Sequence, residues 1–132
     1  MSGKEILVDT NIILYLLNGN DTLENYLQGK NIYLSFITEL ELIAPKVVPD
    51  SEERQIAELL KDCLIISLDD RIKRKYIEMR KQYQLKLADA IIAATAIVNN
   101  LPLITADKQF QTVKELQLVT YHHGITLDKN KQ

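Results

Sequence analysis

Five short apolar runs divide the chain and predict the strands of a sheet. Each run is apolar almost without interruption, instead of alternating apolar and polar positions. Continuous apolar strands of this kind are typical of sheets that are covered by other elements on both faces. The predicted strands are EILVD at residues 5–9, NIYLSF at 31–36, CLIISL at 63–68, PLITAD at 102–107 and QLVTYH at 117–122.

Segments with a helical spacing of apolar residues fill the intervals between these runs. The segment at residues 71–83 places four residues, from Ile72 to Tyr83, at steps of four, three and four, which puts them on one helical face. The segment ADAIIAATAIVN, residues 88–99, is apolar on nearly all sides, which predicts a helix in the interior. Further helices are predicted over residues 11–18, 21–29, 38–44, 50–62 and 108–116.

Strands and helices that alternate along a chain predict an α/β fold. We expect a single domain over residues 1–132, with a central, mostly parallel five-stranded sheet flanked by helices on both faces, and disorder stays an open option for the tail from about residue 124. In such sheets ligands bind beyond the carboxyl ends of the strands, where the strand order reverses. Asp9 ends the first predicted strand and Asp107 the fourth. If these strands are neighbours at the reversal, the two aspartates face each other.

Composition places the chain among ordinary folded proteins, since 46% of its 132 residues are hydrophobic and 26% are charged. Cys63 is the only cysteine, so no internal disulfide can form, and we expect a reducing compartment, the cytoplasm. No apolar run approaches the roughly 20 residues that a membrane helix needs, so no membrane partner is expected.

The charge is unevenly spread. The net charge of the chain is −2, yet the segment from Arg71 to Lys86 holds seven basic residues and one acidic residue. Such a strip is most often a solvated helix face, and it can also approach the phosphates of a polyanion. Arg74, Lys75 and Lys81 are the candidates for contact with RNA.

Several acids stand where chemistry is expected: Asp9, Glu39 or Glu41, Asp89 and Asp107. Oxygen ligands without a nearby His or Cys favour hard cations such as Mg²⁺ or Mn²⁺. Packed carboxylates repel, which raises their pKa values, and a divalent cation relieves that conflict. A bound cation can also activate a water molecule and hold a phosphate oxygen, which are the two services that phosphodiester hydrolysis needs.

Each acid also has a purely structural interpretation. Asp9 can cap the helix that follows it, Asp89 can complement a helix dipole, and Asp107 can be a turn residue. Glu41 stands three residues after Thr38, which is the spacing of a capping box. Residues two positions apart on a helix point to nearly opposite sides, so only one of Glu39 and Glu41 can join the other acids.

Four stretches of the chain together resemble the PIN domain family, and most closely its VapC-type toxins. They are ILVDTNIILYLL, LSFITELEL, LADAIIAATAIVNNLPLITADKQF and ELQLVTY, and they span about residues 6–121. The third stretch is the most specific, with an acid, an alanine-rich helix, a short strand and then Thr-x-Asp. Pro45 and Pro49 depart from the family pattern, where many relatives continue a helical hairpin, and this puts the partner-binding surface in doubt.

The resemblance implies a PIN-like nuclease domain that binds Mg²⁺ or Mn²⁺ and cuts RNA. Carried over, the metal-binding and catalytic acids are Asp9, Glu41, Asp89 and Asp107, with Thr105 as a polar neighbour. The Thr-x-x-Glu spacing of the family selects Glu41 over Glu39. The resemblance further implies a homodimer and a small antitoxin protein as partner.

Two other classes of function remain open at this stage. One is a PIN-like scaffold that binds RNA without cutting it. The other is a phosphoacceptor domain resembling response-regulator receivers, with SLDD at residues 67–70 as the acceptor. That class expects paired acids after the first strand and a lysine after the fifth, and neither is present. His122 and His123 are adjacent on a predicted strand, where neighbouring side chains point to opposite faces, so a joint role as metal ligands is disfavoured.

Overall fold

The structure is a computed structural model that describes residues 4–43, 50–122 and 125–128. One six-stranded sheet runs through it in the order β3-β2-β1-β4-β5-β6. The strands are β1 (Glu5–Val8), β2 (Asn31–Ser35), β3 (Leu64–Ile66), β4 (Leu103–Thr105), β5 (Leu118–Tyr121) and β6 (Ile125–Asp128). The first five are parallel, as predicted, and β6 runs antiparallel to β5.

Strand β6 is a difference from the sequence-based expectation. The sequence predicted five strands and left disorder open for the tail from about residue 124, whereas Ile125–Asp128 adds a sixth strand to the edge of the sheet. Strand β6 can follow β5 closely in the sequence, because antiparallel neighbours need no crossover helix. Residues 129–132 of the predicted tail lie outside the described residues.

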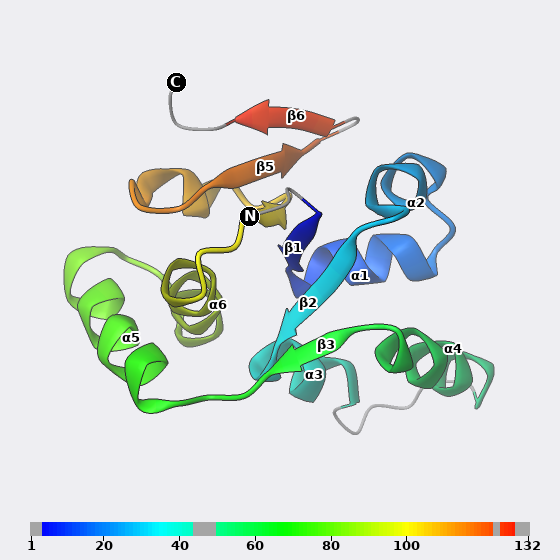
Figure 1. Cartoon of the computed structure of the whole chain (residues 1–132), viewed down its shortest axis with the longest axis horizontal. Helices are drawn as coiled ribbons and strands as arrows, with labels where there is room; N and C mark the ends of the chain where they lie inside the picture. Colours follow the sequence, from blue (N-terminus) through cyan, green and yellow to red (C-terminus); the bar gives the residue numbers. More distant parts are fainter. Residues whose placement is uncertain (1–3, 44–49, 123–124, 129–132) are drawn as a thin grey trace.

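Helices cover both faces of the sheet, as predicted (Figure 1). One core lies between the sheet and α5 (Asp70–Gln82) with α6 (Leu87–Val98), and the other lies between the sheet and α1 (Thr10–Leu17), α2 (Asp21–Leu27) and α4 (Asp50–Lys61). The strands are apolar throughout because successive residues enter opposite cores. In β1, for example, Leu7 faces the first core, whereas Ile6 and Val8 face the second.

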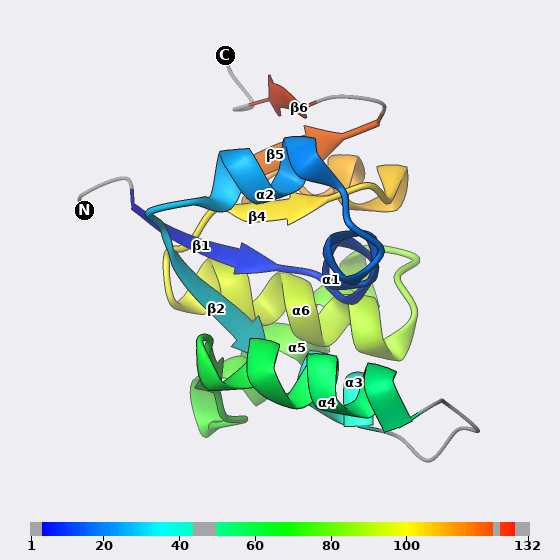
Figure 2. The same ribbon diagram turned by 90° about the vertical axis from the view of Figure 1, so that its right-hand side faces the viewer.

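The position of helix α6 accounts for its high alanine content. It lies between the sheet and α5, so that it is covered on two sides (Figures 1 and 2). Its alanines Ala90, Ala93, Ala94 and Ala96 are almost fully buried. Small side chains let a helix approach its neighbours closely, and this tight packing fixes the position of the first turn, which carries Asp89.

The region before β5 departs from the predicted helix over residues 108–116. Only a short 3-10 helix, η1 (Lys108–Thr112), forms there. Phe110, Val113 and Leu116 are each 1% exposed and lie three residues apart. Phe110 lies in η1, whereas Val113 and Leu116 lie beyond its end, so the apolar spacing does not reflect one continuous helix, and the prediction of a helix over residues 108–116 was wrong.

The remaining helix, α3 (Phe36–Ile43), follows β2 without a loop. Pro45 and Pro49, whose effect on the partner-binding surface was in question, lie outside the described residues, and α4 is described from Asp50. Within the described ranges no helix has the length and apolar content needed to cross a bilayer.

Candidate functional site

The strand order reverses at β1 and β4, which are parallel neighbours. Chain connections lead from β1 to β2 and β3 on one side, and from β4 to β5 on the other. Asp9 directly follows β1, and Asp107 comes two residues after β4. The first and fourth predicted strands are therefore neighbours, as the sequence analysis required for Asp9 and Asp107 to meet. The two aspartates lie at the same edge of the sheet, where ligands bind in folds of this class.

Asp9 is the most buried acid of the site, with 4% of its surface exposed. Both carboxylate oxygens accept hydrogen bonds. The N–H of Ile12 donates to Oδ1 at 3.0 Å, and the hydroxyl of Thr105 donates to Oδ2. Asp9 is thus the N-cap of α1, as the structural interpretation predicted, and it lines the cavity as well.

Thr105 connects Asp9 to Asp107. It is the last residue of β4 and is 1% exposed. Its Oγ1 donates to Asp9 and accepts a hydrogen bond from the backbone N–H of Asp107 at 3.0 Å. The Asp107 side chain in turn accepts from the N–H of Gln109 at 2.9 Å and caps η1. One hydroxyl therefore links the side chain of Asp9 to the backbone of Asp107.

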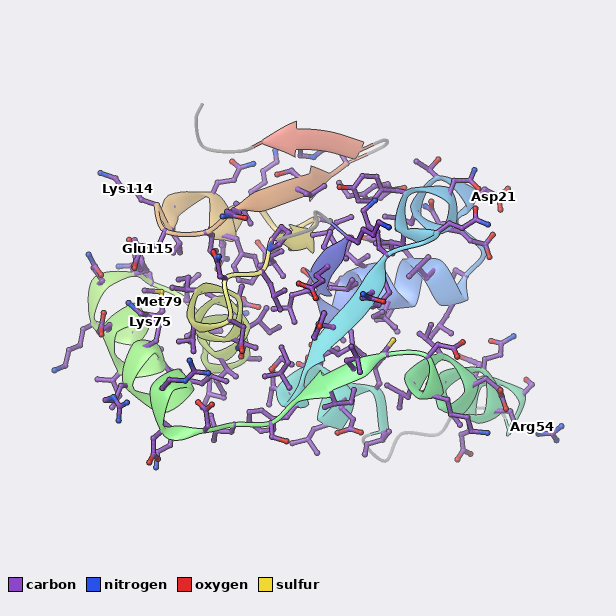
Figure 3. The ribbon with its side chains drawn as sticks, in the orientation of Figure 1. Asp21, Arg54, Lys75, Met79, Lys114 and Glu115 are labelled. Carbon is purple, nitrogen blue, oxygen red and sulfur yellow. The ribbon has the colours of Figure 1, made fainter. Side chains whose placement is uncertain are left out.

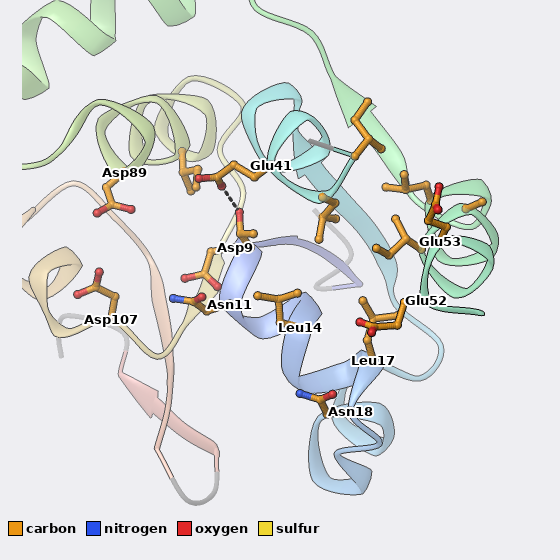
Figure 4. Close-up of a pocket in the computed structure, with 17 residues that line it drawn as sticks. Asp9, Asn11, Leu14, Leu17, Asn18, Glu41, Glu52, Glu53, Asp89 and Asp107 are labelled. Atoms are coloured by element: carbon orange, nitrogen blue, oxygen red, sulfur yellow. Dashed lines mark hydrogen bonds between the residues drawn. The ribbon is translucent and has the colours of Figure 1, made fainter. Parts of the chain in front are cut away.

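Asp89 approaches the same site from α6. It lies in the first turn of that helix, partly buried, and lies across the opening from Asp107 (Figure 4). Among the described residues no hydrogen bond to its carboxylate is found, so both of its oxygens remain available. This differs from Asp9, whose two oxygens are both engaged.

Glu41 completes the group from α3. Its Oε1 accepts a hydrogen bond from the hydroxyl of Thr10 at 2.5 Å (Figure 4). Glu41 lines the cavity, whereas Glu39 is not among the lining residues. The capping-box interpretation of Thr38 and Glu41 was wrong, because α3 begins at Phe36 and Thr38 lies inside it.

The acids open into a cavity of about 920 Å³. Polar residues gather at one end, where Asn11 of α1 joins the four acids (Figure 4). The other end is an apolar groove between α1, α3 and α4, and Glu52 and Glu53 of α4 also line the cavity. We call this end the apolar groove; its members are Leu14, Leu17, Ile43, Ile56, Ala57 and Leu60.

Burial is the main electrostatic feature of Asp9. Loss of water around the carboxylate raises its pKa from 3.8 to about 6, although the hydrogen bonds from Thr105 and Ile12 act in the opposite direction. The charges of Asp89 and Asp107 raise the pKa further, with a smaller effect.

The pKa of Asp89 is raised by the same causes, in the same order of size. Burial raises the pKa of Asp89 most, the charges of Asp107 and Glu41 add to the rise, and Lys86 opposes it. The sequence predicted raised pKa values from mutual repulsion of the carboxylates. The direction is confirmed for Asp9 and Asp89, but desolvation has the larger share, because the apolar sheet and α6 surround these groups.

The donor set fits a hydrated divalent cation. Four carboxylates share one cavity, and oxygen ligands suit Mg²⁺ or Mn²⁺. Within the described ranges, however, no three His, Cys, Asp or Glu side chains lie close enough together to hold one ion directly. Mg²⁺ commonly keeps several waters and takes one or two carboxylates, so the arrangement fits such an ion and does not fit a fully dehydrated one.

The basic helix α5 is less free than its sequence indicates. Lys75 forms ion pairs with Glu78 at 3.1 Å and with Glu115 at 3.3 Å, and its side chain is 20% exposed (Figure 3). Arg74 and Lys81 are exposed. None of these three basic residues lines the cavity. His122 is exposed and does not line the cavity either, and His123 lies outside the described residues.

Three polar residues at the site were not predicted from the sequence. Asn11 lines the cavity, and Thr10 and Thr38 contact Glu41 directly or through one another. Two of them, Thr10 and Asn11, could have been found from their position in the sequence. They directly follow Asp9 and therefore start the helix that begins at the site. The apolar groove was also missed, because its residues come from three helices far apart in the sequence.

Comparison with known proteins identifies relatives over nearly the whole chain. Ribonuclease VapC1 of Methanocaldococcus jannaschii is 32% identical in an alignment of 125 residues, and the match covers 89% of this chain and 88% of that protein. A toxin–antitoxin complex from Klebsiella pneumoniae matches with 31% identity and a TM-score of 0.75, over 87% of this chain and 96% of that one. VapBC2 of Rickettsia felis, bound to promoter DNA, has a TM-score of 0.81 over 89% and 99% of the two chains; at 23% identity it supports the fold alone.

The sequence model of the PIN domain family matches residues 6–116, which include nearly all of β1, the whole of β2, β3 and β4, and all the described helices. The acids that the cavity brings together, Asp9, Glu41, Asp89 and Asp107, all fall inside that range. The chain belongs to the PIN domain family.

Proposed function

We propose that this protein is a metal-dependent endoribonuclease and the toxin of a toxin–antitoxin pair. The observation that carries the proposal is the joint placement of Asp9, Glu41, Asp89 and Asp107 in one cavity at the switch point of the sheet. The relatives agree with it, since one is a ribonuclease and another is part of a toxin–antitoxin complex. We expect the cytoplasm as its location.

One or two of the four acids would hold Mg²⁺ or Mn²⁺ directly, and the others would hold it through its bound water molecules. When bound, the cation supplies an activated water and a counter-charge for the phosphate. Asp9 is fixed by Ile12 and Thr105, so it acts as a rigid ligand, while Asp89 and Asp107 face each other across the opening. The amide of Asn11 can donate a hydrogen bond to a phosphate oxygen at the same end of the cavity.

The direct test is cleavage of RNA by the purified protein. We expect products with Mg²⁺ or Mn²⁺ and none with EDTA, measured on gels with a labelled RNA of mixed sequence. Binding of this RNA without cleavage at any metal concentration would favour the scaffold alternative. The receiver-like alternative has little support, because Asp69 caps α5 through the N–H of Ile72 and neither Asp69 nor Asp70 lines the cavity.

The two glutamates of α3 should differ in their effect on the rate. We expect Glu41→Gln to lower the cleavage rate by about 10- to 100-fold, because it removes a charge from the cavity. Glu39→Gln is the matched control, and its rate should stay within about twofold of wild type. Initial cleavage rates at saturating Mn²⁺ measure the effect of both substitutions. A larger loss of rate in Glu39→Gln than in Glu41→Gln would assign the site to Glu39 instead.

Basic residues of α5 should contribute to RNA binding in different ways. We expect the double variant Arg74→Gln, Lys81→Gln to flatten the dependence of log Kd on log salt concentration by roughly 0.7 to 1 for each phosphate that is no longer bound. Lys75→Gln should change this slope less, since the ion pairs with Glu78 and Glu115 already occupy Lys75. Filter binding with EDTA at several salt concentrations measures the slopes. Equal slopes for wild type and the double variant would leave α5 as a solvated face.

The apolar groove supports a protein partner. Leu14 and Ile43 are 42% and 56% exposed, and the groove continues into the acidic end of the cavity. A small antitoxin that covers both would need apolar side chains for the groove and a basic side chain for the acids.

We also propose that the protein forms a homodimer. Light scattering of the isolated protein tests this proposal by giving its molar mass in solution.

A further inference from the structure

Glu41 differs from the other three acids in how it is held. The three aspartates stand at a strand end or in the first turn of a buried helix, whereas Glu41 is an exposed residue two positions before the end of α3. A glutamate side chain has several freely rotating bonds, so an exposed one samples many positions. A metal ligand must be held within a fraction of an ångström, and the helix backbone alone does not provide this for Glu41.

Thr10 supplies the missing contact. Its Oγ1 lies 2.5 Å from Oε1 of Glu41 and 3.1 Å from Oγ1 of Thr38. A threonine hydroxyl carries one proton, and a carboxylate can only accept, so the proton of Thr10 is directed to Glu41. The hydroxyl of Thr38 then donates to Thr10. A hydrogen bond to a charged acceptor is stronger than one between neutral groups, which favours this arrangement.

The two threonines are well placed for such a role. Thr38 is fully buried inside α3, and Thr10 is the first residue of α1, directly after Asp9. The pair therefore joins the helix that follows one acid to the helix that carries another. Only Oε1 of Glu41 is engaged by Thr10, so Oε2 stays available to a ligand in the cavity.

We propose that Thr10, backed by Thr38, is a positioning residue that holds Glu41 in the metal-binding arrangement. The inference rests on the proposed function, because it concerns the same site. Thr10 does not contact the reacting atoms in this role; it acts through Glu41 alone. A merely structural Thr10, which only starts α1, would instead affect stability and leave metal affinity and rate unchanged.

A double-mutant cycle with Glu41 separates the two roles. The variants are Thr10→Val, Glu41→Gln and their combination; Thr10→Ser keeps the hydroxyl, and Thr10→Ala removes it without added bulk in case Val does not fold. Thr22→Val, at an exposed threonine in the first turn of α2, is the matched control. Titration calorimetry of the RNA-free protein gives the Mn²⁺ affinity, and steady-state kinetics give kcat and KM separately.

We expect Thr10→Val and Thr10→Ala to weaken Mn²⁺ binding and to lower kcat by about tenfold each, with KM changed less than about twofold. Thr10→Ser should restore both, and Thr22→Val should resemble wild type. In the Glu41→Gln background, Thr10→Val should change Mn²⁺ affinity and kcat no further, since the charged ligand that Thr10 positions is no longer present.

The inference is overturned if Thr10→Val binds Mn²⁺ and cuts RNA like wild type, or if its effect multiplies with that of Glu41→Gln. A wild-type protein that neither binds Mn²⁺ nor cuts RNA would overturn the proposed function and this inference with it. The two failures are distinguishable, because the first appears only in the variants and the second appears in the wild type.

Discussion

In EDTA, the stability of the Asp9→Asn variant relative to the wild-type protein is expected to rise by about 3 kcal/mol, or roughly 10 °C in melting temperature, between pH values below 4 and pH 7. The reason is the buried carboxylate, whose pKa rises from 3.8 to about 6 on folding. An acid with a raised pKa binds its proton more tightly in the folded state, so its contribution to stability is complete below about pH 4 and is lost as the pH rises through 6. Asparagine carries no charge and can still cap α1.

The effect is measured by urea unfolding of the wild-type protein and the Asp9→Asn variant in EDTA from pH 4 to pH 7.5. The difference between their free energies of unfolding should grow with pH. Asp69→Asn is the matched control, because Asp69 caps α5 through the N–H of Ile72 in the same way but is exposed to solvent. Its difference from wild type measures the cost of replacing a capping carboxylate at an exposed position. A difference for Asp9→Asn that is constant across the range would mean that Asp9 is not a desolvated acid in the folded state.

Asp89→Asn should lower the rate of RNA cleavage by about 100-fold or more, because it removes a charged group of the proposed metal site at nearly constant shape. Without metal, the variant should be at least as stable as wild type, since the pKa of Asp89 is raised and its charge is costly near neutral pH. Metal at 100 times its Kd should stabilise wild type by about 2.7 kcal/mol and the variant much less. Thermal melts with and without Mn²⁺, combined with a cleavage assay, provide the three measurements.

A first-turn acid with no role beyond the helix dipole gives the opposite pattern. Asp70 of α5 is such an acid, exposed and outside the cavity. Asp70→Asn should lower stability by a few tenths to about 1 kcal/mol, respond to Mn²⁺ like wild type and keep full activity. If Asp89→Asn behaves like Asp70→Asn in all three measurements, Asp89 is not part of the metal site.

Much of the fold could be predicted from the sequence because its signals are local. A continuous apolar run such as that of β1 indicates a strand covered on both faces, and the alanine-rich segment of α6 indicates a buried helix. The rule on switch points then placed Asp9 and Asp107 at one edge, and the pairing of β1 with β4 confirms their placement. The PIN resemblance selected Glu41 over Glu39, and the cavity includes Glu41.

Features that depend on contacts between distant segments could not be predicted in this way. Thr38 and Glu41 have the spacing of a capping box, yet Glu41 bonds to Thr10, 31 residues earlier in the chain. Likewise, Lys75 is one charge of a basic strip in the sequence, although Glu115 pairs with it across 40 residues. Repulsion between acids can be inferred from their number, but desolvation depends on what surrounds them, and this emerges only when α6 packs against the sheet.

The alanine-rich interior of α6 has a consequence for how this chain can vary. Ala90, Ala93, Ala94 and Ala96 set the gap between the sheet and α5, so a larger side chain at any of these positions would push the layers apart and shift the first turn with Asp89. Substitution there is confined to residues of similar volume. The outer face of α5 has no such limit, so drift along a lineage can change the charge of that surface while the distance between layers stays the same.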